Sequence, residues 1–382
     1  MAELKLPGAG RFVLREPEPL PVGARPAAAR TVFAAAHVVA DPLGDNTPGA
    51  PAAVDWPATL AFRHHLWELG LGVADSMDTA QRGMGLDWAA TQELIARSGA
   101  EAKAVGGRLA CGAGTDQLPS PSASLAEITA AYEEQLEVVE AAGAQPILMA
   151  SRALAATAHG PDDYLRVYGR LLEQSARPVV LHWLGDMFDP ALAGYWGSAD
   201  LDQATATVLE LIGGHAERID GIKVSLLDAD REIALRRALP ESVRLYTGDD
   251  FNYPELIRGD ELGHSHALLG VFDPIAATAA AALQALDAGD LDRYDALFAP
   301  TLPLARHLFA APTYHYKTGI VFLAWLGGHQ DHFTMVNAAQ ANRSVPHLVE
   351  LFKLADAAGV LPDPDLAAHR MRAFLSVAGV AG

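Results

Sequence analysis

The chain has 382 residues, of which 50% are hydrophobic and 20% are charged, so a large core is available and wholesale disorder is not expected. The formal net charge of −19 argues against a binder of nucleic-acid backbones, because such a protein needs a basic face. The single cysteine, Cys111, excludes an intrachain disulfide and favours a reducing, cytoplasmic location. Residues 1–30 do not resemble a signal peptide, and no apolar run is long enough to predict a membrane span.

Short apolar runs alternate with amphipathic stretches along most of the chain. Each run is bounded by Gly, Pro, Asp or Ser, as buried parallel strands usually are. The predicted strands cover residues 31–39, 70–75, 108–114, 145–150, 177–183, 219–224, 242–248 and 263–269. The predicted helices between them cover about residues 57–69, 87–104, 123–142, 161–175, 201–214 and 228–238.

This alternation predicts an α/β fold in which eight strands close into a (β/α)8 barrel, or TIM barrel. An open doubly wound sheet is the alternative, although no G-x-G-x-x-G motif follows a strand. Residues 1–30 are then an N-terminal extension, residues 31–274 the barrel, and residues 275–382 a C-terminal helical extension packed on it. Helices are predicted in that extension over residues 275–288, 290–310, 316–327, 333–341, 344–358 and 363–377.

Polar residues at the C-terminal ends of the predicted strands are the candidate site, because barrels of this type perform their chemistry there. For the individual Asp and Ser residues, capping of helix N-termini is an equally good interpretation. The candidates are His37, Asp75, Ser76, Asp78, Thr79, Ser151, Arg152, His182, Lys223, Ser225, Tyr246, Asp249, Asp250 and His266.

Lys223 differs from the other candidates because it lies inside an apolar strand, residues 219–224. A buried lysine is costly to keep charged, so its pKa tends to fall. The neutral amine is a nucleophile toward carbonyl carbon, which is the chemistry of Schiff-base enzymes. A structural ion pair with an acid such as Asp75 or Asp249 is the alternative interpretation.

The residues around Lys223 resemble a known family of barrel enzymes. Gly221-Ile222-Lys223, followed one strand later by Thr247-Gly248-Asp249-Asp250, is similar to a motif of the dihydrodipicolinate synthase / N-acetylneuraminate lyase family. The similarity covers roughly residues 31–300 and suggests a divergent bacterial branch. It implies a class I aldolase or lyase of carbohydrate metabolism that needs no cofactor. In that family the lysine forms an imine with a 2-oxo acid or an oxo sugar, and Lys223 takes this role by direct match.

Two parts of the family pattern are absent from this chain. The family has a Gly-Thr-Thr-Gly-like segment after strand two that holds the substrate carboxylate, whereas residues 74–87 offer only Thr79 there. The family also has a proton-relaying tyrosine after strand four, where this chain has Met149-Ala150-Ser151-Arg152. These differences favour another, more hydroxylated substrate, for which acids such as Asp78 would suit the hydroxyl groups.

The proton relay must therefore come from elsewhere in the barrel. We expect His182, His37 or Tyr246 to serve, because imidazole titrates near neutral pH. The cluster of residues 314–317 (Tyr-His-Tyr-Lys) could reach the barrel mouth, although packing between helices is the commoner role of such a cluster.

Two other functions stay open. A divalent-metal-dependent sugar isomerase or hydrolase could use Zn²⁺ or Mn²⁺ ligands among His37, Asp75, His182, Asp249, His264 and His266. A non-catalytic sugar-acid sensor is the third possibility. As partners we expect a small carbonyl substrate and a second copy of the chain, in a dimer or tetramer, with no nucleic acid and no membrane.

Overall fold

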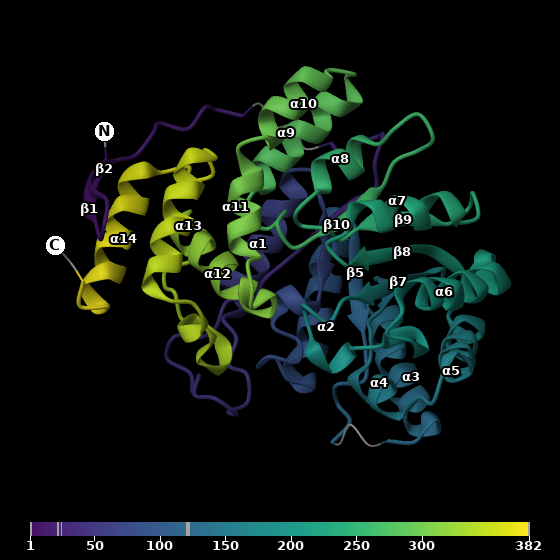
Figure 1. Cartoon of the computed structure of the whole chain (residues 1–382). Helices are drawn as coiled ribbons and strands as arrows, with labels where there is room; N and C mark the ends of the chain where they lie inside the picture. Colours follow the sequence, from purple (N-terminus) through teal and green to yellow (C-terminus); the bar gives the residue numbers. More distant parts are fainter. Residues whose placement is uncertain (1, 21–22, 24, 120–122, 381–382) are drawn as a thin grey trace.

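Eight parallel strands close into a barrel at the centre of the molecule (Figure 1). The structure is a computed structural model that describes residues 2–20, 23, 25–119 and 123–380. The strands follow one another around the barrel in the order β10-β3-β4-β5-β6-β7-β8-β9, which confirms the TIM barrel and excludes the open sheet. They are β3 (Val32–Ala35), β4 (Gly72–Asp75), β5 (Leu109–Ala113), β6 (Gln145–Leu148), β7 (Val179–Leu184), β8 (Ile219–Ser225), β9 (Arg244–Thr247) and β10 (His266–Leu269).

Helices follow the strands and cover the outside of the barrel. Several begin where an Asp or Ser side chain accepts a hydrogen bond from a backbone N–H of the first turn, as Asp87 and Ser124 do. The α-helices are α1 (Trp56–Glu68), α2 (Trp88–Val105), α3 (Leu125–Ala141), α4 (Arg152–Thr157), α5 (Pro161–Gln174), α6 (Leu201–His215), α7 (Ala229–Ala238) and α8 (Tyr253–Arg258). Short 3₁₀ helices are η1 (Asp78–Ala80), η2 (Pro190–Leu192), η3 (Tyr195–Gly197) and η4 (Ala216–Arg218).

After β10 the described elements are helices, and Figure 1 shows α12–α14 gathered beside the barrel. The predicted helix over 290–310 is interrupted at Pro300, which has no N–H to donate. In place of the helix predicted over 333–341 the structure has a short 3₁₀ helix, which Asn337 and Ala338 interrupt with positive φ; the Asn337 side chain accepts a hydrogen bond from Gly49 N. The elements are α9 (Ala276–Asp287), α10 (Leu291–Phe298), α11 (Thr301–Leu308), η5 (Thr313–His315), α12 (Tyr316–Leu326), η6 (Val336–Asn342), α13 (Val345–Ala357) and α14 (Pro364–Val377).

An antiparallel hairpin that the sequence patterns did not predict precedes the barrel. It consists of β1 (Glu3–Leu6) and β2 (Gly10–Val13), and Figure 1 shows it next to α14. The Phe12 ring lies 5.8 Å from that of Phe352 on α13, and Arg372 on α14 donates a hydrogen bond to the carbonyl of Glu3. The hairpin therefore packs on the C-terminal helices. Among the described residues, no helix combines the length and apolarity needed to cross a bilayer.

The side-chain alternation of the strands decides which residues face the barrel interior. One compact cluster fills it, made of Phe33, Ala35, Ala74, Met77, Ala110, Ile147, Met149, Val180, Tyr246 and Leu268. Lys223 is in register with Tyr246 on one side and with His182 on the other. Because residues in register on parallel strands point the same way, Lys223 points into the barrel.

Candidate active site

Lys223 lies near the C-terminal end of β8 and is 7% exposed. Gly248, directly after β9, lies against the Lys223 side chain. A Cβ atom at Gly248 would collide with Lys223 Cε, with the Ser225 hydroxyl and with the carbonyl of Val224. The glycine of the Thr-Gly-Asp-Asp motif therefore leaves the space that the lysine side chain occupies.

A narrow cavity surrounds the Lys223 side chain at the mouth of the barrel, and we call it the lysine cavity. Its polar walls come from four places: η1 after β4, the end of β8, the turn after β9 and the start of α12. The remaining walls are apolar. The lining residues are Met77, Asp78, Thr79, Leu184, Phe188, Lys223, Ser225, Asp250, Gly270 and Tyr316.

The electrostatics of the lysine cavity favour a neutral amine. Burial lowers the pKa of Lys223, and the carboxylates of Asp78 and Asp250 oppose this only in part. Burial likewise raises the pKa of Asp250 to about 7, although its carboxylate accepts a hydrogen bond from Val271 N at 2.9 Å and faces Lys223. The cavity thus holds a lysine whose pKa is lowered beside an acid whose pKa is raised to about 7.

Tyr316, the first residue of α12, closes the lysine cavity from outside the barrel. Its hydroxyl lies 2.9 Å from the hydroxyl of Thr79, and burial raises its pKa well above the usual value. The sequence predicts only that the cluster of residues 314–317 could reach the barrel mouth, and Tyr316 was not among the candidate site residues. Its position depends on how α12 packs against the barrel, which no local pattern reveals.

A second, larger cavity of about 390 Å³ adjoins the lysine cavity, and we call it the outer cavity. The two meet at Asp78, which lines both. The outer cavity also presents the hydroxyl groups of Thr115 and Ser151, which lie 2.6 Å apart. Its two arginines are Arg152, at the start of α4, and Arg82, which the sequence analysis did not select.

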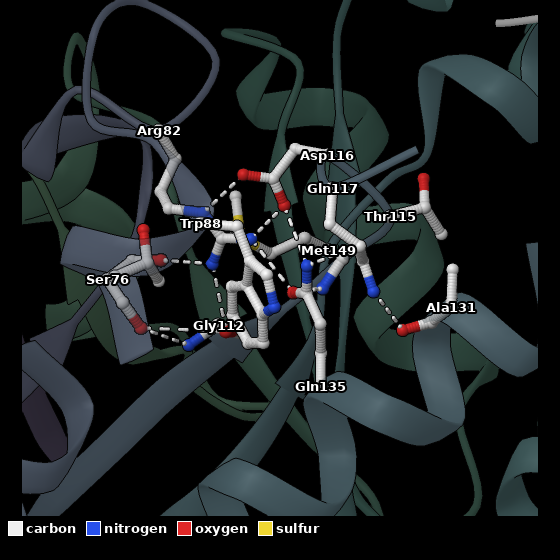
Figure 2. A network of polar contacts seen from close by, with 12 residues as sticks. Ser76, Arg82, Trp88, Gly112, Thr115, Asp116, Gln117, Ala131, Gln135 and Met149 are labelled. Atoms are coloured by element: carbon white, nitrogen blue, oxygen red, sulfur yellow. Dashed lines mark hydrogen bonds and ion pairs between the residues drawn. The ribbon is translucent and has the colours of Figure 1, made fainter. Parts of the chain in front are cut away.

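Figure 2 shows the polar network that holds Arg82. Its guanidinium donates to both carboxylate oxygens of Asp116, to Gln135 Oε1 at 2.8 Å, and to the carbonyls of Ser76 and Gly112 at 3.1 Å each. Burial acts to raise the pKa of Asp116, but Arg82 and Gln135 outweigh it, so the pKa lies below the usual value. All five N–H donors of Arg82 are thus engaged within the protein.

The structure brings one group of predicted site residues together at these cavities. Asp78, Thr79, Lys223, Ser225 and Asp250 line the lysine cavity. Ser151 and Arg152 line the outer cavity, where Arg152 Nε pairs with Asp189 at 2.6 Å.

Other predicted residues have partners outside the cavities. Asp75 forms a buried ion pair with Arg63, and Ser76 Oγ lies against the backbone of Gly112. Asp249 accepts hydrogen bonds from the N–H groups of Phe251 and Asn252 in the turn before α8. His37 Nδ1 lies 2.7 Å from Asp273, and its Nε2 lies 3.1 Å from Gln330.

The three remaining predicted residues lie deeper in the barrel or at its far end. The Tyr246 hydroxyl donates a hydrogen bond to Asp220, at the start of β8. His266 Nδ1 accepts one from Thr31 N, just before β3. His182 is fully buried, with Nε2 3.4 Å from Ser225 Oγ. Burial, and then the charge of Lys223, lowers the pKa of His182 well below the usual value, so this histidine is neutral.

The candidate metal ligands do not converge. Within the part of the chain that the structure describes, no three side chains of the His, Cys, Asp or Glu types lie close enough to hold a metal ion. His264 and His266 are neighbours, with ring centroids 5.2 Å apart, but His266 is engaged with Thr31. The metal-dependent alternative therefore has no site among the described residues.

Solved structures with the same fold include those of dihydrodipicolinate synthases and their relatives. YagE, a prophage protein from E. coli K12, is 16% identical, with a TM-score of 0.66 over 87% of this chain and 100% of its own. The chloride-inhibited dihydrodipicolinate synthase from Acinetobacter baumannii is 18% identical, with a TM-score of 0.65 over 87% and 100%. The putative dihydrodipicolinate synthetase from Pseudomonas aeruginosa is 16% identical, with a TM-score of 0.63 over 86% and 99%. At this identity the likeness is one of fold, and it confirms the fold that the resemblance implied.

The chain belongs to a family whose model covers more than half of it. The family model described as "Protein of unknown function (DUF993)" matches residues 6–380, nearly the whole chain. A comparison with curated proteins gives no match.

Proposed function

We propose that this protein is a Schiff-base aldolase or lyase whose nucleophile is Lys223. The observation that carries the proposal is the buried Lys223 amine, which faces a narrow cavity at the barrel mouth together with Asp78 and Asp250. A lysine with a lowered pKa in such a place is suited to attack a carbonyl carbon. Structures of YagE and of the Acinetobacter enzyme hold pyruvate, which supports a small carbonyl compound as the substrate.

The proposed reaction begins when Lys223 Nζ attacks the carbonyl carbon. A C–N bond forms, the carbonyl oxygen takes up a proton, and that oxygen then leaves as water to give an iminium ion. The iminium withdraws electrons from the neighbouring carbon, so a C–C bond of that carbon can break: its electron pair forms the enamine, and the other fragment leaves as a carbonyl compound when its hydroxyl group loses a proton. For a lyase that breaks a C–O bond, the neighbouring carbon instead loses a proton to give the enamine, which then expels the oxygen from the next carbon. Protonation of the enamine and hydrolysis return the free amine.

Proton transfer in this scheme falls to residues of the lysine cavity. Asp250, with a pKa of about 7, is suited both to give and to take a proton near neutral pH. The Tyr316 hydroxyl keeps its proton and can donate a hydrogen bond to the substrate oxygen. The proposed relay thus differs from the expected one, which consisted of His182, His37 or Tyr246. None of these three residues lines the lysine cavity, whereas Asp250 and Tyr316 do.

Reductive trapping tests the proposal directly. The protein is incubated with pyruvate or hydroxyacetone and cyanoborohydride, which reduces an iminium ion to a stable secondary amine, and the adduct is located by peptide mass spectrometry. The chain has five lysines, Lys5, Lys103, Lys223, Lys317 and Lys353, so the assignment is unambiguous. We expect the adduct on Lys223. An adduct confined to other lysines, or none with either compound, would reject the proposal.

The pH dependence of trapping gives a second prediction. The Asp250 carboxylate raises the pKa of Lys223, so Asp250→Asn should lower that pKa further. The free amine then persists to lower pH, and the rising limb of the trapping rate, normalised to its maximum, should move to lower pH. Glu350→Gln, at a distant pair with Lys353, is the control that should leave the limb in place. A limb that moves to higher pH would contradict the role given to Asp250.

A further inference from the structure

The charges around Lys223 limit which chemical group the substrate can carry next to its carbonyl carbon. Two carboxylates, Asp78 and Asp250, share the lysine cavity with the amine, together with the hydroxyl groups of Thr79, Ser225 and Tyr316. Among the described residues that line this cavity, the only cationic side chain is Lys223 itself, and its nitrogen becomes the iminium ion of the proposed reaction. A carboxylate on the carbon next to the iminium carbon would therefore have no other side-chain cation of the lysine cavity to pair with, and it would have to share the iminium charge with Asp78 and Asp250.

The outer cavity adds no unpaired cation beside this position. Arg82 has all five N–H donors engaged and is paired with Asp116. Arg152 keeps some donors for a ligand at the rim, but it shares its charge with Asp189. Asp78 stands at the junction and is a third carboxylate on the outer cavity wall.

Lys317 is another buried cation near the lysine cavity. Its Nζ lies 4.8 Å from the centre of the Tyr316 ring and donates hydrogen bonds to Met84 Sδ and to the carbonyl of Tyr314, both at 3.2 Å. It lines neither cavity, although its charge interacts with that of Asp78, which lines both. It therefore offers no direct contact to a group next to the imine carbon.

Carboxylates and hydroxyl groups are the right partners for hydroxyl groups on a substrate. An ionised carboxylate accepts strong hydrogen bonds from O–H donors, and Thr79, Ser225 and Tyr316 can both donate and accept. In the outer cavity, Thr115 and Ser151 offer two more hydroxyl groups that can donate or accept hydrogen bonds. A chain of hydroxyl-bearing carbons that runs from the imine position past Asp78 would find an acceptor or donor along its length.

We propose that the substrate is a hydroxylated ketone or aldehyde of the oxo-sugar type, with a hydroxyl-bearing carbon rather than a carboxylate next to the carbonyl that Lys223 attacks. This inference rests on the Schiff-base function proposed above and chooses between the two substrate classes that it leaves open. Asp78 is assigned the position beside that hydroxyl-bearing carbon, because it lines both cavities.

Hydroxyacetone and pyruvate form a matched pair for the test, since they differ only in a hydroxymethyl group against a carboxylate. The rate of adduct formation on Lys223 is measured for each compound in the wild-type protein and in Asp78→Asn. We expect the wild type to favour hydroxyacetone by about tenfold or more, because a like charge beside a ligand group is strongly unfavourable. In Asp78→Asn the rate ratio should move toward pyruvate by about tenfold, and this change does not depend on the intrinsic reactivity of the two carbonyls.

Each outcome decides between the two proposals. Faster trapping of pyruvate on Lys223, or equal trapping of both compounds, would overturn the hydroxylated-substrate inference and leave the Schiff base in place. No adduct on Lys223 with either compound would instead reject the proposed function. Asp250→Asn gives the same ratio test if Asp78→Asn does not fold, which circular dichroism would show. Glu350→Gln should keep the wild-type ratio.

Discussion

Replacing Lys223 by methionine is expected to lower turnover of any carbonyl substrate by about four orders of magnitude or more, because the variant has no amine to form the imine. Methionine has a similar length and no charge, so it can occupy the space beside Gly248. The measurement is the initial rate of product formation, together with trapping, which should find no adduct.

Lys317→Met is the matched comparison for that variant. Lys317 is also buried, and burial lowers its pKa to about 8, yet it lies outside both cavities. Its loss should leave the adduct on Lys223. If Lys223→Met retained more than a few per cent of the wild-type rate, or if only Lys317→Met abolished trapping, the nucleophile would have been assigned to the wrong lysine.

The largest effect on stability is expected for Arg63→Ala. Arg63 and Asp75 are both fully buried, and the guanidinium donates to both carboxylate oxygens, at 3.1 and 2.8 Å, and also to the carbonyls of His37 and Thr59. Removal of the arginine leaves a buried carboxylate without its partner. The free energy of unfolding should fall by about 3–5 kcal/mol, measured by urea denaturation followed by circular dichroism.

Arg11→Ala provides the control for that measurement. Arg11 pairs with Glu3 on the surface of the hairpin, where both side chains are more than half exposed. Such a pair contributes about 1 kcal/mol or less, so this variant should unfold close to the wild type. Similar losses in the two variants would show that burial of the Arg63–Asp75 pair has no special energetic role.

The barrel could be predicted from the sequence because its strands are short, apolar and sharply bounded. All eight predicted strands are present, since a run such as residues 177–183 is buried on both faces and shows no helical period. The N-terminal hairpin could not be found this way. Its residues are stabilised by α14 and by Phe352 on α13, which are distant in the sequence.

Only the part of the candidate site that lies at the ends of strands could be predicted from the sequence. Asp78, Thr79 and Asp250 were selected because they follow strands, and Lys223 because it lies near the end of an apolar strand. All four do meet at one cavity. Asp75 was selected for the same reason, but its side chain points outward to Arg63 on α1. A shift of one residue along a strand decides whether a side chain points into the barrel or outward. The end of a strand cannot be placed that accurately from the sequence.

Tyr316 and Arg82 show the other limit of the sequence patterns. Tyr316 reaches the lysine cavity because α12 packs across the barrel mouth. Arg82 is held at the outer cavity because four residues accept its hydrogen bonds. Both positions depend on tertiary contacts. The contact of Tyr316 with Thr79, and three of the contacts of Arg82, join residues that are 30 or more positions apart in the sequence. Neither belongs to a motif that local spacing could reveal.

The position of Tyr316 has a consequence for the chemistry of the amine. The barrel supplies Lys223, but a ring from a helix outside the barrel shields that amine from water. Hydration is what keeps an ordinary lysine charged, so the C-terminal helices help to set the basicity of the nucleophile without contributing an atom to the imine. The reactivity of this lysine is therefore a property of the assembled chain, and a barrel on its own would return the amine to solvent.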